Sequence, residues 1–477
     1  MHVTMKQNQD FPLGPRNVSI SKTGDAPDVI SEIESSESST DIASYFRPQY
    51  SATIHGKIVV SSSVLELIKQ GASAEINFAA LNVFLRSGFY VGTKTLYRDI
   101  HTREVPNPAS LVVKPSDGNR SAIVEGYIEL FRQAVQRQIQ RFGSDRICMG
   151  LSGGRDSRHI LLELCRVGVK PDVCWTVDLP NSPSELTIAQ RLTHKAGVPH
   201  ISLTAASSVE TEQYKNQVTN FESTEHGWSV AAIPIIQRHL MIYDGMAGDV
   251  LSAGHFLTDE GVRLVHQGRI DEFVEKVIVR PGPVPLVRDQ NLFPVQTALE
   301  VVSAEFRRHL AMPNPIGSFY LWNRTRRTIG SSAFGLLCPS GQQTCVPYLD
   351  GNLFAFLSAI PDTMLVDHEL HTDTIRRAFP EYADIPYAFK IKPQNLSHWN
   401  RRLAVGTARY LAIHPSPLLS RRTALLLLAR GFLSPTYLAD VNWVHAISMY
   451  LAEAGSLNNG LSFGLTRERA IAGTSTT

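Results

Sequence analysis

Several features that would assign a class of protein at once are scarce in this sequence. It contains only five cysteines in 477 residues, and no two of them have C-x-x-C spacing. This scarcity argues against a disulfide framework and against a structural zinc site. Because the cysteines lie in apolar contexts, we expect buried thiols in a reducing, cytoplasmic compartment.

Long apolar runs and strong charge are also missing. The longest late apolar cluster, Thr423 to Leu428, is flanked by arginines and is far shorter than the roughly 20 residues of a membrane-spanning helix. Residues 1–41 are polar, without the apolar segment of a signal peptide. The net charge is +2, with no dense basic run. We therefore expect neither a membrane nor a nucleic acid as partner.

The chain is too long for one hydrophobic core, so we expect roughly two or three domains. Residues 1–46 are predicted to be a polar, weakly ordered tail. Residues 47–120 predict a small α+β domain, with strands at 57–60 and 110–113 and helices at 63–69 and 79–85. Residues 121–400 predict an α/β domain, and residues 401–477 a helical extension. The composition allows a homodimer but does not require one.

The α/β prediction comes from alternating periodicities after residue 121. Helical spacing over 121–141, 158–167, 184–196 and 231–239 alternates with apolar strands at 146–149, 173–177, 200–203 and 240–243. This order is typical of a doubly wound, mostly parallel sheet, which binds ligands at the carboxyl ends of its strands. Beyond Phe256 the pattern is mainly helical, with predicted helices at 270–279, 295–310, 319–329, 352–359 and 373–379.

A glycine-rich loop follows the strand at 146–149. Its residues Ser152, Gly153, Gly154, Asp156 and Ser157 lead directly into a helix. Adjacent glycines let the backbone approach a bulky anion, which the helix dipole and free N–H groups favour. An aspartate beside a phosphate is reasonable if Mg²⁺ lies between them. The alternative is a strand-to-helix turn without a ligand. No lysine follows the glycines, so this is not a Walker A loop.

A second turn of the same kind follows the strand at 240–243. It contains Gly245, Gly248 and Asp249. Two acidic glycine turns on one sheet are stronger evidence for phosphate binding than one turn. Asp156 and Asp249 can then share Mg²⁺ on one triphosphate.

The S-G-G-x-D-S pattern resembles the pyrophosphate loop of the ATP pyrophosphatases. With Gly245–Asp249, Pro347–Asp350 and a late lysine, it resembles the synthetase domain of the asparagine synthetase family over roughly residues 85 to 400. Relatives in that family include β-lactam synthetases and lasso-peptide cyclases. The segment 89–100 resembles the connection between the two halves of these enzymes, so 47–120 is interpreted as a degenerate remnant of the glutaminase half.

The resemblance implies an ATP-pyrophosphatase-type fold, ATP and Mg²⁺ as cofactors, and a ligase that activates a carboxylate as an acyl-adenylate for attack by an amine. Asp249 and Lys390 are the implied catalytic residues, with Lys390 favoured over Lys392 as the cation at the α-phosphate. Asp156 and Asp249 are the implied metal ligands. The implied nucleotide contacts are Leu151, Ser152, Gly153, Gly154, Asp156, Ser157, Val177, Gly245 and Gly248.

The sequence also departs from the family pattern. No cysteine follows the initiator Met, so we expect no glutamine hydrolysis, and the substrate is expected to be a small molecule or peptide carrying a carboxylate and an amine. Met246 replaces a residue that can deprotonate an amine, and Ala247 replaces a glycine. Gln343 and Cys345 replace a glutamate and an arginine. These changes leave two alternatives open: a lasso-peptide-type macrolactam cyclase, and a catalytically silent nucleotide-binding relative.

Weaker candidates lie elsewhere in the chain. Residues 225–228 are candidates for the pocket lining. The arginines at 324, 326 and 327 either hold a substrate carboxylate or form a solvated helix face. Asp350 is expected to cap a turn near the site. His368 and His371 are too close in sequence for the H-E-x-x-H zinc pattern.

Overall fold

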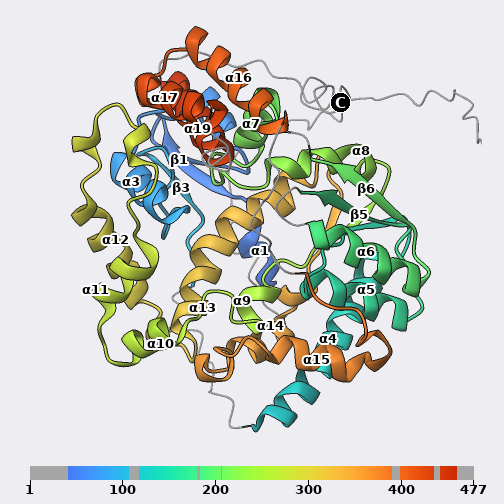
Figure 1. Ribbon diagram of the computed structural model, residues 1–477. Helices are drawn as coiled ribbons and strands as arrows, with labels where there is room; N and C mark the ends of the chain where they lie inside the picture. The colour runs from blue at the N-terminus through green and yellow to red at the C-terminus, as the bar shows by residue number, and fades with distance from the viewer. Residues whose placement is uncertain are drawn as a thin grey trace, which may run out of the picture. The chain divides into compact units, whose positions relative to one another are not determined.

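The computed structural model describes residues 41–106, 118–179, 183–205, 207–388, 398–433 and 441–458, and its centre is a five-stranded parallel sheet (Figure 1). These residues belong to one compact unit that begins at Asp41. The strand order is β6-β5-β4-β7-β8. The strands span Ile147–Gly150 (β4), Val173–Asp178 (β5), His200–Thr204 (β6), Met241–Tyr243 (β7) and Gln343–Cys345 (β8).

The sheet is doubly wound, as the sequence predicts. The chain starts at β4, moves outward through β5 to β6, then returns to the other side of β4 as β7 and β8. All four neighbouring pairs are parallel, with Cys148 of β4 opposite Val173 on one side and Ile242 on the other. Every residue of β7 is buried. Continuous apolar strands of this kind are typical of parallel sheets that are covered on both faces.

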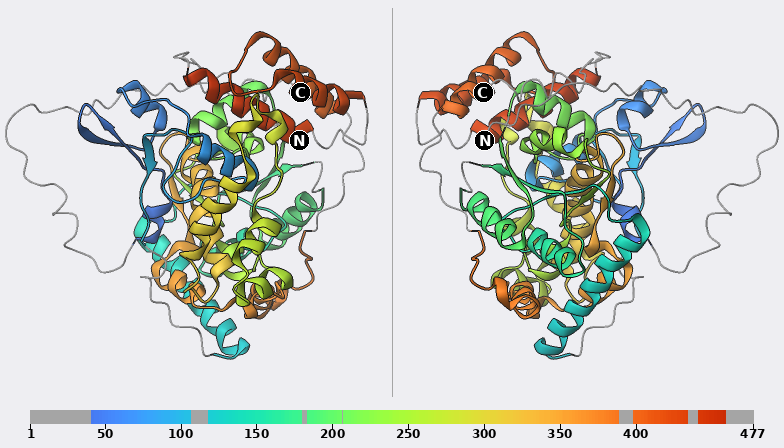
Figure 2. Two further views of the ribbon diagram at one scale, coloured as in Figure 1. Left: turned by 90° about the vertical axis from the view of Figure 1, so that its left-hand side faces the viewer. Right: turned by 90° about the vertical axis from the view of Figure 1, so that its right-hand side faces the viewer.

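Three of the four predicted helices of the α/β region, at 121–141, 158–167 and 184–196, are present with shifted ends. Helix α4 begins where the Asn119 side chain accepts the N–H of Ala122, and it ends at Gly143, whose φ of 89° no longer fits a helix. Its buried stripe includes Tyr127 and Phe131. Figure 2 shows α4 as a long turquoise helix. The helices α4 to α6 span Arg120–Phe142, Asp156–Arg166 and Pro183–Ala196.

The N-terminal part is α+β, as predicted. Strands β1 (Tyr50–Ile54), β2 (Lys57–Ser61) and β3 (Ile100–Thr102) form an antiparallel sheet in the order β2-β1-β3, beside helices α2 (Val64–Lys69) and α3 (Phe78–Ser87). The hairpin turn uses His55 and Gly56, which both have positive φ, as a tight two-residue hairpin requires. The strand predicted at 110–113 lies outside the described residues.

Helices α16 (His398–Ile413), α17 (Arg421–Leu433) and α19 (Val441–Asn458) make up the C-terminal helical region, in agreement with the prediction. They share one hydrophobic core with the N-terminal part. Tyr450 stacks on Phe84 with ring centroids 4.9 Å apart, and its hydroxyl lies 2.5 Å from that of Tyr90.

Several elements differ from the prediction. The helix expected at 231–239 is a short 3-10 segment, Gly227–Ala232, followed by α8. The helices expected at 270–279 and 319–329 continue into π-helical segments, η3 (Val274–Ile278) and η6 (Leu321–Ile329), and a third, η7, spans Ser332–Leu336. Strand β8 and helix α7 have no counterpart in the prediction.

The remaining helices are α7 (Val209–Val218), α8 (Ile233–Ile236), α9 (Gly248–Ser252), α10 (Asp259–His266), α11 (Ile270–Phe273), α12 (Val295–Arg307), α13 (Pro315–Tyr320), α14 (Gly351–Ser358) and α15 (Leu370–Ala378).

The predicted polar tail ends earlier than residue 46. Residues Ile42–Phe46 form helix α1, and Phe46 is buried with its ring centroid 5.6 Å from that of Trp322. The aromatic pair Tyr45 and Phe46 gives this segment an apolar face that the acidic stretch before it lacks. Among the described helices, none is both long enough and apolar enough to cross a membrane.

Candidate functional site

The two acidic glycine turns lie side by side at the point where the strand order reverses. Strand β4 leads into the first turn and helix α5, and its neighbour β7 leads into the second turn and helix α9. In a doubly wound sheet, the loops that leave two such strands diverge and open a crevice at their carboxyl ends. The predicted approach of residues 152–157 and 245–249 is therefore present.

Glycine makes this approach possible. A Cβ atom at Gly245 would lie 2.8 Å from Cβ of Asp156, and one at Gly248 would lie 2.7 Å from Oδ1 of Asp156. Both distances are too short for a side chain. The second turn therefore packs directly against the aspartate of the first.

A cavity of about 870 Å³ opens between the turns. Most of the predicted nucleotide contacts line it. These are Leu151, Ser152, Gly154, Asp156, Ser157, Val177 and Gly245. The predicted metal ligand Asp249 and the weaker candidates His226 and Trp228 also line it, together with Arg155, Trp175, Asp244 and His255, to which the sequence assigned no role.

Two predicted contacts, Gly153 and Gly248, are not in the cavity wall. A Cβ at Gly153 would lie 2.6 Å from Cβ of Ala388, and the Gly153 carbonyl accepts the N–H of Ala388 at 2.9 Å. Gly248 lies against Asp156 and Tyr348. Both glycines therefore serve close packing behind the cavity.

The first loop is held by its own hydroxyls. The N–H of Ser152 donates to Oγ of Ser157 at 3.1 Å, and the N–H of Gly154 donates to Oγ of Ser152 at 3.2 Å. Helix α5 begins at Asp156 without a side-chain cap on its first N–H groups. An uncapped helix start that borders a cavity offers N–H donors and a positive dipole end to an anion.

Three carboxylates gather at the two turns. Burial raises the pKa of Asp156 to about 7 and that of Asp244 to about 6. Burial and the nearby Asp156 also raise the pKa of Asp249. Oδ1 of Asp156 lacks a hydrogen-bond donor, although a quarter of the side chain remains accessible. These groups hold protons more tightly than free carboxylates do, which is the condition in which a divalent cation can replace a proton.

The sequence missed two residues at this centre. Asp244 directly follows β7, and its Oδ1 accepts the N–H of Met246 at 2.8 Å. An acid that follows a buried strand was the available signal for it. His371 is fully buried, with Nδ1 3.3 Å from Oδ1 of Asp156. Burial lowers the pKa of His371 to about 3, so it is neutral and brings no charge to the aspartate. No local pattern marks it, because it comes from the distant helix α15.

In the parts of the chain that the structure describes, no three His, Cys, Asp or Glu side chains converge to hold a metal ion by themselves. Mg²⁺ on a nucleotide needs only one or two protein carboxylates, because phosphate oxygens and water complete its shell. Asp156 and Asp249 fit that role.

The residues that depart from the family pattern are at or near the cavity. Met246 and Ala247 line it, and Ala247 adopts a φ of 75°, a conformation that glycine adopts more easily. Gln343 and Cys345 belong to β8, and burial raises the pKa of Cys345 to about 12. Lys390 and Lys392 lie outside the described residues.

Among the weaker candidates, His226 and Trp228 line the cavity. Asp350 is a cap, as expected, because its carboxylate accepts the N–H groups of Asn352 and Leu353 at the start of α14. Of the two alternatives for the three arginines, the solvated face is wrong for Arg326 and Arg327, which are buried.

The chain matches no protein-family model, and no curated protein matches it.

Proposed function

We propose that the protein is an AMP-forming, ATP-dependent carbon–nitrogen ligase with an ATP-pyrophosphatase-type fold. It would activate a carboxylate as an acyl-adenylate, which an amine then attacks without hydrolysis of glutamine. The observation that carries the proposal is the meeting of two acidic glycine turns at the switch point of the sheet, around one large cavity.

The first turn supports polyphosphate binding. The uncapped start of α5 and the hydroxyls of Ser152 and Ser157 present donors to the cavity. Arg155 adds a cation in the same wall. These groups suit an anion of several charges better than a neutral ligand.

The carboxylates support a divalent cation on that polyphosphate. Asp156 and Asp249 would hold Mg²⁺, which would neutralise charge on the pyrophosphate as it leaves. Lys390 stays the proposed cation at the α-phosphate. The described segment 207–388 ends two residues before Lys390. The N–H of its last residue, Ala388, donates to the carbonyl of Gly153 in the first turn.

Residues 1–147 contain no cysteine that could serve glutamine hydrolysis, so the proposal keeps direct attack by an amine. All five cysteines are free thiols. This supports the proposed reducing, cytoplasmic setting.

The test follows pyrophosphate and AMP. The full chain is incubated with Mg²⁺, ATP and a metabolite extract of its native host, and products are identified by mass spectrometry. We expect AMP and pyrophosphate, and a product lighter by one water than its two parts. Asp249→Asn should lower pyrophosphate release by roughly a hundredfold or more, because charge on the leaving group loses its counterion.

The matched control is Asp145→Asn, which removes an exposed carboxylate that precedes β4, at the opposite end of that strand from the first turn, and should leave the rate unchanged. ADP in place of AMP would contradict the proposal, and so would an Asp249→Asn variant as active as the parent. Tight binding of Mg·ATP with no turnover would favour the silent nucleotide-binding alternative.

A further inference from the structure

Part of the cavity wall comes from the π-helical segments η6 and η7. Thr325 and Ile329 of η6, Ser332 and Ala333 of η7, and the following Leu337 all line the cavity. None of these side chains carries a charge. Met246, which follows the glycine packed on Asp156, continues this uncharged wall up to the second turn.

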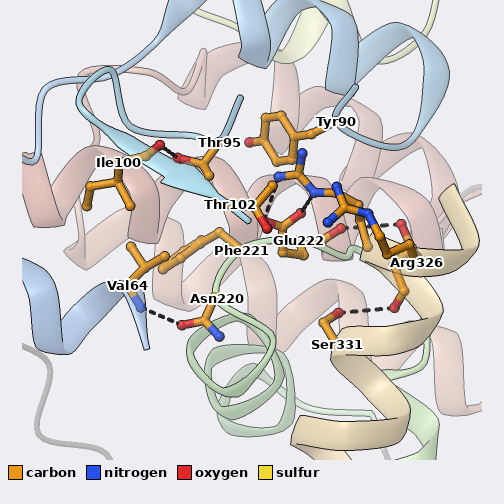
Figure 3. A network of polar contacts seen from close by, with 12 residues as sticks. Val64, Tyr90, Thr95, Ile100, Thr102, Asn220, Phe221, Glu222, Arg326 and Ser331 are labelled. Carbon is orange, nitrogen blue, oxygen red and sulfur yellow. Dashed lines mark hydrogen bonds and ion pairs between the residues drawn. The ribbon is translucent and has the colours of Figure 1, made fainter. Parts of the chain in front are cut away.

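The arginines of η6 do not supply a charge to this wall. Arg327 pairs with Glu222 through Nε at 2.8 Å and Nη2 at 2.7 Å, and both side chains are buried. Arg326 donates to the carbonyls of Trp322, Arg103 and Gly92. Figure 3 shows Glu222 and Arg326 within one polar network together with Tyr90 and Thr102.

The third arginine of η6, Arg324, is paired as well. Its Nη2 lies 2.8 Å from Oε2 of Glu225. Arg324 is partly exposed, and the cavity wall does not include it. The buried guanidinium groups of Arg326 and Arg327 already have acceptors, so they would have to break existing bonds to bind a new carboxylate.

One cation lines the cavity among the described residues, and it belongs to the phosphate loop. Arg155 donates from Nε to Oγ1 of Thr372 at 2.6 Å. The charged residues that remain in the wall are acidic, including Asp156, Asp244 and Asp249.

Three histidines also line the cavity, and none offers a free cation to the uncharged wall. Burial lowers the pKa of His226. The nearby Arg324 and Lys215 lower this pKa further, whereas Glu225 raises it. His368 uses Nδ1 on the carbonyl of Ala253 at 3.0 Å. His255 lies within electrostatic range of Asp156 and Asp249, at the phosphate end.

We infer that the acid activated in this cavity carries a single carboxylate, the one that reacts, on an uncharged and largely apolar body. This inference rests on the proposed function and narrows its substrate class. Among the residues that the structure describes, the one cation of the wall, Arg155, belongs to the phosphate loop, and the other charged wall residues are acids. A second carboxylate on the acid would therefore have to leave water without a counterion from these residues, which is costly. We therefore expect dicarboxylic acids such as aspartate to be poor substrates for activation.

Two probes of equal chain length test the inference: hexanoate, with one carboxylate, and adipate, with two. Their binding to the full chain is measured by ligand-observed NMR with Mg²⁺ and a non-hydrolysable ATP analogue. We expect hexanoate to bind roughly tenfold more tightly than adipate, or better, because only adipate must bury an unpaired charge. Equal or tighter binding of adipate would overturn the inference, and so would binding of neither probe at about 10 mM.

A cation placed in the wall should reverse this preference. Ile329 is only partly buried, so Ile329→Lys can direct its ammonium into the cavity. We expect the hexanoate-to-adipate ratio to fall by roughly fivefold or more in this variant. Ile329→Met is the matched control and should keep the ratio of the parent. If Ile329→Lys does not fold, Trp228→Lys introduces the same charge from another partly exposed position of the wall.

Binding of Mg·ATP is measured by calorimetry in the same samples. If the parent protein does not bind Mg·ATP, the proposed ligase function is refuted. If it binds Mg·ATP but prefers adipate to hexanoate, only the inference about the substrate class is refuted.

Discussion

Asp156 shows how a single side chain links the stability of this protein to its site. Its carboxylate lies between the two glycine turns, where burial raises its pKa to about 7. In the unfolded chain the same group has a pKa of about 4. Folding therefore favours the protonated form. The cost of ionisation is absent below about pH 4, grows as the pH rises, and is complete above about pH 7.

Asp156→Asn should therefore stabilise the ligand-free protein at alkaline pH. We expect the free energy of unfolding in urea, with EDTA present, to rise by about 1–2 kcal/mol at pH 8, because the neutral amide removes the buried charge. The gain should shrink toward pH 5, where the parent carboxyl is mostly protonated. The same variant should lose affinity for Mg·ATP.

Asp145→Asn serves as the reference, since its carboxylate is exposed and should show no such pH dependence. An Asp156→Asn protein less stable than the parent at pH 8 would be incompatible with this account of the site.

At the scale of elements, the two turns depend on glycine for packing rather than for flexibility. At Gly248 a Cβ would lie 2.7 Å from Oδ1 of Asp156 and 2.9 Å from Cε2 of Tyr348. Helix α9 therefore cannot keep its position beside α5 if this residue gains a side chain.

Gly248→Ala should lower the midpoint of urea unfolding, by about 1–3 kcal/mol in free energy, and should weaken Mg·ATP binding because the turns are forced apart. Gly406→Ala is the matched substitution. It lies inside α16 with no atom within 4 Å of the new Cβ, so alanine should stabilise the helix by about 0.5–1 kcal/mol. Shifts of the same sign in both variants would contradict the packing argument.

The elements that the sequence predicted best are those with strong local patterns. The strands β4, β5 and β7 are continuous apolar runs, and α4 has a clear apolar stripe with a cap at each end. Strand β8 was missed because its sequence, Gln343 to Cys345, has no strand pattern of its own and is ordered by pairing with β7. The π-helical segments were missed because their extra residue per turn leaves no distinct periodicity.

The candidate site was predictable to the extent that its residues lie in glycine-rich turns between a strand and a helix. Asp156 and Asp249 belong to such turns, and both line the cavity. His371 reaches the site through the tertiary fold alone. The roles of Gly153 and Gly248 in packing depend on neighbours, Ala388 and Tyr348, that are distant in sequence.

At the scale of the whole molecule, one buried ion pair ties distant segments together. Glu222 follows α7, and Arg327 belongs to η6 and also donates to the carbonyl of Gly92 at 3.0 Å. The pair therefore connects the N-terminal part to the wall of the cavity.

Glu222→Gln should destabilise the protein strongly, by about 3–5 kcal/mol, because the guanidinium of Arg327 stays buried without its counterion. The measurement is urea unfolding at neutral pH. The double variant Glu222→Met with Arg327→Met should recover most of that loss, since both charges leave together and Gly92 keeps Arg326 as a donor. A double variant as unstable as the single one would show that the cost does not come from the unpaired charge.

The core shared by the two ends of the chain has a consequence for synthesis. The hydroxyl groups of Tyr90 and Tyr450 are hydrogen-bonded to each other, although the two residues are 360 positions apart in the sequence. At 5–20 residues per second, a ribosome releases the second tyrosine roughly 20–70 s after the first. During that interval the faces of α3 and of the first sheet lack the part of their cover that α16, α17 and α19 supply, so nascent chains are exposed to aggregation or to chaperones until these helices are synthesised. Production at low temperature or with added chaperones should therefore improve the yield of folded protein more than changes at the cavity do.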